Sequence, residues 1–137
     1  MKLSFTSTVI AGLITLASFS AFNCWAHEGH SVPGVLPSTH GGTAIGGKDI
    51  NIEYITNDKE LLIYPLSHDG KDLSLEKVKI SGTAKAPKGK NEILLFNSKD
   101  GVFMTQVDFQ KNHRVEINIV TELNQRKSEF KFQMEKQ

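Results

Sequence analysis

Apolar and polar residues alternate with a period of two along most of the chain after residue 48. The pattern begins at Ile50, Ile52 and Tyr54, which are separated by Asn51 and Glu53. A strand that buries one face alternates in this way, because successive side chains point to opposite faces of a sheet. The alternation recurs in residues 60–66, 77–85, 92–97, 102–110, 115–123 and 128–134. The pattern therefore predicts seven short strands.

Turn-forming residues separate these segments, as at Asn57-Asp58, Asp69-Gly70 and Asp100-Gly101. Short strands every 8 to 12 residues or so, with no segment of helical period between them, are typical of an all-β fold. We expect an antiparallel β-sandwich of about seven strands with immunoglobulin-like packing of two sheets. The predicted core residues are Ile50, Ile52, Leu61, Ile63, Val78, Ile80, Leu94, Phe96, Phe103, Val107, Phe109, Ile117, Ile119, Phe130 and Phe132.

The first 26 residues have the pattern of a secretory signal peptide. Lys2 precedes an apolar stretch, residues 9–22, that is too short for a bilayer-spanning helix. Cys24 and Ala26 occupy the −3 and −1 positions of a cleavage site, so we expect the exported protein to begin at His27. The alternative is a lipoprotein cut before Cys24, but Asn23 does not fit the small residue that this requires.

Residues 27–47 are rich in Gly, Pro, Ser, Thr and His and contain few large apolar side chains. Such a segment gains little from burial to offset its ordering entropy, so we interpret it as an arm that is at least partly flexible. The predicted organisation is a signal peptide at 1–26, this arm at 27–47 and a β-sandwich domain at 48–137.

Charge and cysteine content exclude several classes of function. Without residues 1–26 the chain carries 15 basic and 15 acidic residues and no cysteine. This balance gives no support for binding to nucleic acid or anionic lipid, and we expect no stable membrane insertion after signal cleavage. Disulfides, thiolate metal ligation and thiol catalysis are excluded in the exported chain.

Three of the five histidines, His27, His30 and His40, lie in the arm. Neutral imidazole is a common ligand for copper and zinc. A free α-amino group on His27 would add a second nitrogen from the same residue, although a histidine after a cleavage site can also be incidental. His68 lies in a tight turn beside Asp69-Gly70, where it is either a plain turn residue or a loop-end ligand.

No catalytic motif is present. The spacing in His27-Glu28-Gly29-His30 is three rather than four, and Gly29 and Pro33 oppose the helix that a zinc-protease motif needs. Nucleophile-elbow, phosphate-loop and dinucleotide fingerprints are also missing. We therefore expect the domain not to be an enzyme.

Several short motifs occur in a recognisable order: His40-Gly41-Gly42, a strand with Glu53, then Leu62-Ile63-Tyr64, then His68-Asp69-Gly70-Lys71. Over about residues 39 to 73, this order resembles the small periplasmic β-domains that accompany, or are fused to, heavy-metal efflux adaptor proteins. The resemblance implies a periplasmic location and a link to copper or zinc, with His40 and His68 as the residues that carry over. The chain lacks the helical hairpin and lipoyl-like segments of the adaptors themselves.

Two functional interpretations remain open at this point. The first is an exported periplasmic module that binds a copper or zinc ion through His27, His30, His40 and His68, as a carrier or accessory to a periplasmic efflux component. The alternative is a non-catalytic β-sandwich for structural or protein-interaction purposes, with no metal role. Neither interpretation requires an organic cofactor.

Overall fold

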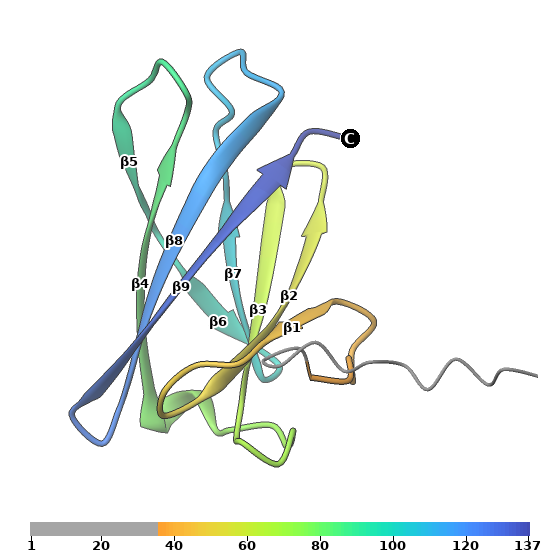
Figure 1. Cartoon of the computed structure of the whole chain (residues 1–137), viewed down its shortest axis with the longest axis vertical. Coiled ribbons are helices and arrows are strands. Elements are labelled where there is room, and N and C mark those ends of the chain that lie inside the picture. Colours follow the sequence, from red (N-terminus) through yellow and green to blue (C-terminus); the bar gives the residue numbers. More distant parts are fainter. Residues whose placement is uncertain (1–35) are drawn as a thin grey trace, which may run out of the picture. The chain divides into compact units, whose positions relative to one another are not determined.

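A computed structural model describes residues 36–137, which belong to one compact unit and form two antiparallel sheets (Figure 1). The five-stranded sheet has the order β1 (Thr43–Ile45), β2 (Asn51–Asn57), β3 (Glu60–Leu66), β7 (Val102–Gln106) and β6 (Asn97–Lys99). The four-stranded sheet has the order β5 (Asn91–Leu94), β4 (Val78–Lys85), β8 (Arg114–Leu123) and β9 (Arg126–Glu135). A short 3-10 helix, η1 (Leu75–Lys77), precedes β4.

The two sheets pack through the apolar faces that alternation creates. In β8, Val115, Ile117 and Ile119 are buried, and Ile52 and Ile63 of the other sheet belong to the same core. All the predicted core residues lie in this core or pack against it, with Ile80, Phe96 and Phe132 half-buried. The predicted two-sheet antiparallel sandwich is therefore confirmed.

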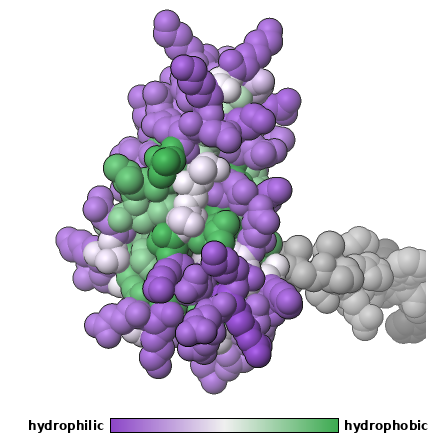
Figure 2. All heavy atoms as spheres, turned by 90° about the vertical axis from the view of Figure 1, so that its left-hand side faces the viewer, coloured by the Kyte–Doolittle hydropathy of each residue, from purple (hydrophilic) through white to green (hydrophobic). Residues whose placement is uncertain are grey.

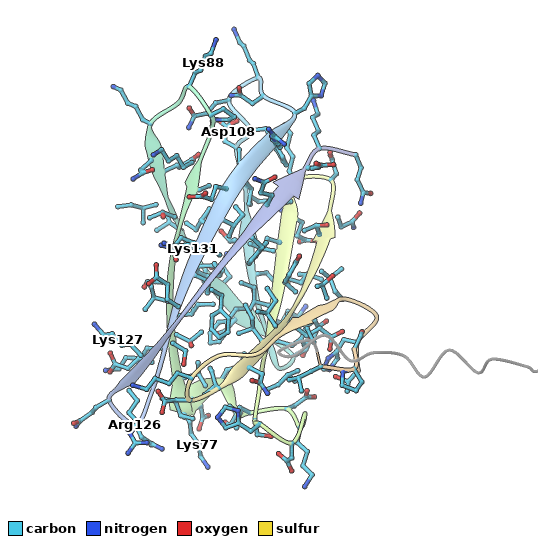
Figure 3. All side chains as sticks on the ribbon, in the orientation of Figure 1. Lys77, Lys88, Asp108, Arg126, Lys127 and Lys131 are labelled. Atoms are coloured by element: carbon cyan, nitrogen blue, oxygen red, sulfur yellow. The ribbon has the colours of Figure 1, made fainter. Side chains whose placement is uncertain are left out.

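The β8–β9 hairpin shows how local chemistry sets the register. Asn124 and Gln125 have φ values of 51° and 65°, which suit a two-residue hairpin turn. Thr121 then pairs with Ser128, and all ten residues of each strand are paired. Charged side chains of β9, among them Lys127 and Lys131, alternate with the buried ones and project outward (Figure 3).

Nine strands, rather than seven, occur among the described residues. The two additional strands are β1 and β6, each of three residues. Both are too short to show alternation, and β6 consists of exposed polar residues. The predicted strand at 92–97 is in fact two, because β5 ends at Leu94 in one sheet and β6 begins at Asn97 in the other.

The five-stranded sheet begins before residue 48, where we expected the β-sandwich domain to start. Thr43 to Ile45 pair with β2, whereas the predicted arm ran to residue 47. The reason is backbone pairing along the edge of β2, which does not depend on large apolar side chains. The predicted signal peptide, His27 and His30 lie outside the described residues.

Within residues 36–137, no helical segment has the length and hydropathy needed to span a bilayer.

Candidate functional site

Glu53 is the centre of the candidate site. It lies in β2 between the core residues Ile52 and Tyr54, so alternation directs its side chain to the outer face of the five-stranded sheet. Strand pairing places Ala44 and Tyr64 directly opposite Glu53. Yet the carboxylate is not exposed: its residue has 0% accessibility. The chain before β1 must therefore cover it.

Residues 38–42 wrap around this carboxylate. Ser38 Oγ donates to Oε1 at 2.6 Å, and the Thr39 amide and hydroxyl both donate to Oε2 at 2.9 Å. The amides of His40 and Gly42 donate to Oε1 at 2.8 and 2.7 Å. We call residues 38–42 the glutamate loop. It contributes the network of donors that a buried carboxylate requires.

The network keeps Glu53 ionised. Burial by itself raises the pKa of Glu53, but the hydrogen bonds from Ser38, Gly42, Thr39 and His40 outweigh burial and lower that pKa well below its ordinary value of 4.5. A fixed negative charge therefore lies beneath the glutamate loop at neutral pH.

Two glycines allow the loop to approach the sheet. Gly41 has a φ of +84°, which disfavours residues with a side chain. A Cβ at Gly42 would collide with the carbonyl oxygen of Tyr54 and lie 2.7 Å from Ile55 Cγ1. The conformation of the loop thus favours glycine at position 41, and its close approach to β2 requires glycine at position 42.

His40 is held on three sides. Its Nδ1 lies 3.0 Å from Glu53 Oε2, and its ring stacks on Tyr64 with centroids 3.9 Å apart and an interplanar angle of 8°. Its Nε2 lies 3.3 Å from Asp72 Oδ1, and the His40 side chain is 23% exposed. The imidazole is therefore fixed in orientation, with one nitrogen toward the buried carboxylate and the other at the surface.

Asp72 reaches this position because the chain doubles back after β3. A bridge pairs Leu66 with Asp72, and the amide of Ser67 donates to the carbonyl of Lys71 at 2.8 Å. Inside this loop, Lys71 and Ser67 hold the pKa of Asp69 at about 2, below its ordinary 3.8. The loop that carries Asp72 is thus closed by backbone and side-chain bonds.

The geometry between His40 and Asp72 has a chemical consequence. With Glu53 ionised, Nδ1–H is the donor that its carboxylate calls for, and in a neutral ring Nε2 then presents a lone pair. In that tautomer the lone pair and the Asp72 carboxylate are both acceptors, and a metal ion between them would satisfy both. In the other neutral tautomer Nε2–H donates to Asp72, and Nδ1 can accept from the Thr39 hydroxyl, which lies 3.0 Å away. The observed separation of 3.3 Å suits a histidine–aspartate contact and also two ligands of tetrahedral zinc, whose donor atoms lie about 3.3 Å apart.

The sequence-predicted ligands are only partly brought together. His40 lies in the site, whereas His68 is exposed in the turn that precedes Asp72. Among residues 36–137, no group of three or more His, Cys, Asp or Glu side chains is arranged to hold a metal ion. Asp72, together with the orienting roles of Glu53 and Tyr64, was missed. The motif order contained Glu53 and Tyr64 but not Asp72, and alternation alone assigns Glu53 to an exposed face.

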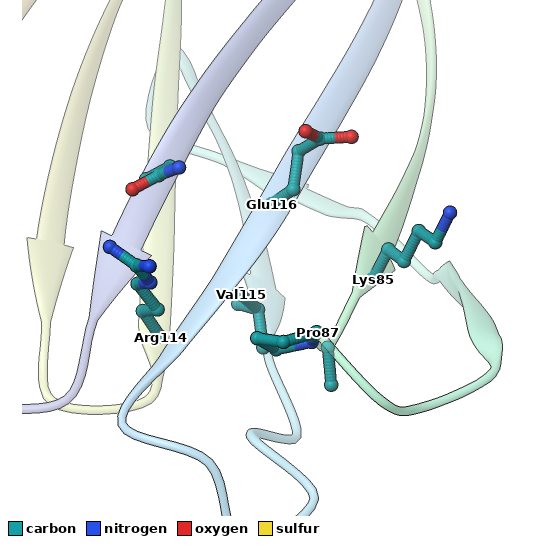
Figure 4. A pocket seen from close by; sticks show the side chains of 7 residues that line it. Lys85, Pro87, Arg114, Val115 and Glu116 are labelled. Atoms are coloured by element: carbon teal, nitrogen blue, oxygen red, sulfur yellow. The ribbon is translucent and has the colours of Figure 1, made fainter.

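A separate hollow of about 230 Å³ lies where β4 ends and β8 begins. Lys85, Arg114 and Glu116 line it, but their charged groups point in different directions (Figure 4). A small site without convergent polar groups does not suit a specific ligand. The His40 region is the better candidate.

No protein-family model matches the chain, and no curated protein matches its sequence. Among solved structures, the chain is similar to the crystal structure of a DUF4426 family protein from Pseudomonas aeruginosa PAO1. The TM-score is 0.49 and the sequence identity 17%, over 67% of this chain and 94% of that chain. These comparisons show no link to metal efflux.

Proposed function

We propose that this chain is an exported, non-enzymatic periplasmic module that binds a copper or zinc ion at His40 and Asp72. The observation that carries the proposal is the 3.3 Å separation of His40 Nε2 and Asp72 Oδ1, with the imidazole oriented by a buried carboxylate. Metal-binding histidines commonly donate their other ring nitrogen to a carboxylate, which fixes the tautomer. Glu53 is placed for this role, because its Oε2 lies 3.0 Å from Nδ1 of His40.

Two donors do not complete a zinc or copper site. His27 and His30 precede the glutamate loop in the chain, and His68 lies four residues before Asp72. In this proposal one or two of these imidazoles, with the His27 amine if cleavage occurs after Ala26, supply the remaining ligands. Water fills any position left open.

The first test is calorimetric titration of the exported chain, residues 27–137, with Zn(II) or Cu(II), because the full chain keeps Cys24 as a thiol ligand and has no free His27 amine. We expect one bound ion, and a loss of affinity of at least about 10-fold in His40→Ala and in Asp72→Asn. His113→Ala is the matched control, because His113 is an exposed histidine of the β7–β8 connection, away from the glutamate loop. Wild-type protein that binds neither metal, or His40→Ala with unchanged affinity, would overturn the proposal.

The arm is tested separately by the double variant His27→Ala/His30→Ala. We expect weaker binding with an unchanged thermal unfolding curve. Point substitutions are preferable to deletion of residues 27–40, because Ser38, Thr39 and His40 also hold Glu53. Intact mass of the protein recovered from the periplasm tests export, and we expect a first residue of His27.

The alternative function is a protein-interaction sandwich without a metal. One observation favours it: Ile93 and Leu95 are large apolar residues that remain 74% and 80% exposed. The titration separates the two functions, because an interaction module without a metal role shows no metal binding that depends on His40.

A further inference from the structure

Glu92 is a carboxylate outside the His40 region that lies in an unusual place. It belongs to β5, where strand pairing places it opposite Ala84, a core residue with 1% accessibility. Paired residues point to the same face of a sheet, so the Glu92 side chain points inward, between the two sheets. Among the described residues, Oε2 of Glu92 is buried and has no hydrogen-bond partner. A buried acceptor without a partner lowers the stability of a fold, so its presence calls for a reason.

β5 is an open edge of the four-stranded sheet. It ends the strand order of that sheet and, within residues 36–137, pairs only with β4. Alternate N–H and C=O groups along its other side therefore have no strand partner, which makes the edge a template for another strand.

The sequence at this edge favours association. Ile93 to Phe96 are four consecutive large apolar residues, and Ile93 and Leu95 are 74% and 80% exposed. Figure 2 views this side of the sandwich and shows hydrophobic residues gathered in its middle, with hydrophilic residues above and below. Short apolar segments on an exposed edge are prone to strand pairing between copies of a chain. The edge therefore requires protection.

The other sheet edges are protected in two ways. At the opposite edge of the same sheet, β9 carries charged outward residues, including Lys127, Glu129 and Lys131. In the other sheet, the edge strands β1 and β6 are only three residues long. Charged side chains and short edge strands both oppose the addition of another strand, and so do charged residues that point inward from an edge. In β5, Glu92 is a residue of this last kind.

Glu92 opposes strand addition through its own hydration. The residue as a whole is half-buried, so water still reaches part of its side chain. A strand added beside β5 would extend the inner face of the sheet and enclose that part, while Oε2 already lacks a donor that could compensate for lost hydration. Removal of a carboxylate from water without such donors is strongly unfavourable. The penalty on the carboxylate therefore offsets what the apolar residues gain from pairing.

We propose that Glu92 is a gatekeeper residue: its inward carboxylate keeps the β5 edge from pairing with other copies of this chain, and it lowers the stability of the monomer. The two effects have opposite signs for one substitution. An apolar side chain in place of the carboxylate should make the folded monomer more stable and should also make it associate more readily. Loss of a residue that only supports the fold would not stabilise the monomer.

Glu92→Val in the exported chain, residues 27–137, tests both effects. We expect its midpoint of thermal unfolding, measured at low concentration, to rise by at least about 3 °C, because the unpartnered carboxylate oxygen is removed. In sedimentation velocity, with a chelator present to exclude metal bridging, we expect association at a concentration at least about 10-fold lower than for the wild type. Glu116→Val is the matched control, because it removes the same charge at an exposed position of the interior strand β8. It should not promote association.

Two further variants identify the cause of the association. Glu92→Lys keeps a charge at the inward position, so we expect it to remain as monomeric as the wild type. Glu92→Val/Ile93→Lys places a new charge on the same edge, so we expect it to lose the association that Glu92→Val shows alone.

The proposal is overturned by a Glu92→Val variant that associates no more readily than the wild type. It is also overturned if Glu92→Val fails to fold or unfolds at no higher temperature, because the carboxylate then does not lower the stability of the monomer. Association of Glu92→Lys to the same extent as Glu92→Val would show that the charge is not the cause. Association that persists in the double variant would place the contact on another surface, and either result contradicts the role assigned to Glu92.

Discussion

Glu53 is a charged side chain in a place where a charge is costly. A carboxylate removed from water is destabilising by several kcal/mol unless hydrogen bonds replace its hydration. Here every residue of the glutamate loop except Gly41 donates to it. The ionised carboxylate therefore organises five residues that have almost no apolar surface of their own.

Replacing Glu53 tests this role. Glu53→Gln keeps the size of the side chain but removes the charge and turns an amide N–H₂ toward N–H donors, so we expect the free energy of unfolding to fall by about 2–4 kcal/mol. Glu129→Gln, at an exposed position of β9, is the control and should change it by less than about 0.5 kcal/mol. Urea denaturation of both variants gives the comparison, and equal stabilities would contradict the proposed role.

The same residue predicts a pH dependence. Because the pKa of Glu53 in the folded protein lies well below its ordinary value of 4.5, the unfolded state takes up a proton first as the pH falls. Its stabilisation is therefore complete above about pH 5 and is lost progressively below that, by up to about 1.4 kcal/mol per pH unit. The stability difference between wild type and Glu53→Gln should shrink between pH 5 and pH 3. A difference that stays constant over this range would argue against the lowered pKa.

At the scale of elements, the stability of the glutamate loop and the orientation of His40 depend on the close approach of the loop to β2. Gly42→Ala places a methyl group against the carbonyl of Tyr54 and 2.7 Å from Ile55 Cγ1. We expect a loss of about 2 kcal/mol in the free energy of unfolding, together with weaker metal binding, because His40 loses its fixed orientation. Thr43→Ala, at the next and exposed position, is the control. Unchanged denaturation and titration curves for Gly42→Ala would contradict this account.

Strands with a buried face could be predicted from the sequence, and strands without one could not. β2, β8 and β9 alternate clearly, and their core residues were predicted. β6 has no buried residue, and β1 has one small one, Ala44, so periodicity gave no signal for either. Their pairing is a property of neighbouring backbones, which a single sequence does not display.

The site could be predicted only at His40. Histidine is rare enough in this chain to be noticed, whereas Glu53, Tyr64 and Asp72 are ordinary residues for a strand or a loop. They meet His40 because strand register places Glu53 opposite Tyr64 and the Leu66–Asp72 bridge returns the chain to the same place. Contacts that depend on register between distant segments are not encoded in local spacing.

At the scale of the whole molecule, the glutamate loop joins the chain before β1 to the outer face of a sheet whose inner face forms the core. Asn51 extends this link, because its side chain accepts from the amide of Gly47 and donates to the carbonyl of Ser67. The outer face of the five-stranded sheet is thus tied to two flanking loops by polar contacts. The apolar core and these hydrogen bonds together stabilise the folded unit.

Two fragments distinguish the contributions of the core and the glutamate loop. A fragment of residues 36–137 retains the core, the loop and all the Glu53 donors, so we expect its free energy of unfolding to match that of the full chain within about 0.5 kcal/mol. A fragment of residues 43–137 keeps the core but leaves Glu53 without Ser38, Thr39, His40 and Gly42. We expect it to be less stable by about 3 kcal/mol at pH 7 and to lose most of that deficit near pH 3, where the full chain also loses the contribution of Glu53. Urea denaturation at the two pH values measures both effects. Equal stability of the two fragments at pH 7 would mean that the loop contributes nothing to the free energy of unfolding and that water solvates the Glu53 carboxylate as well as the loop does.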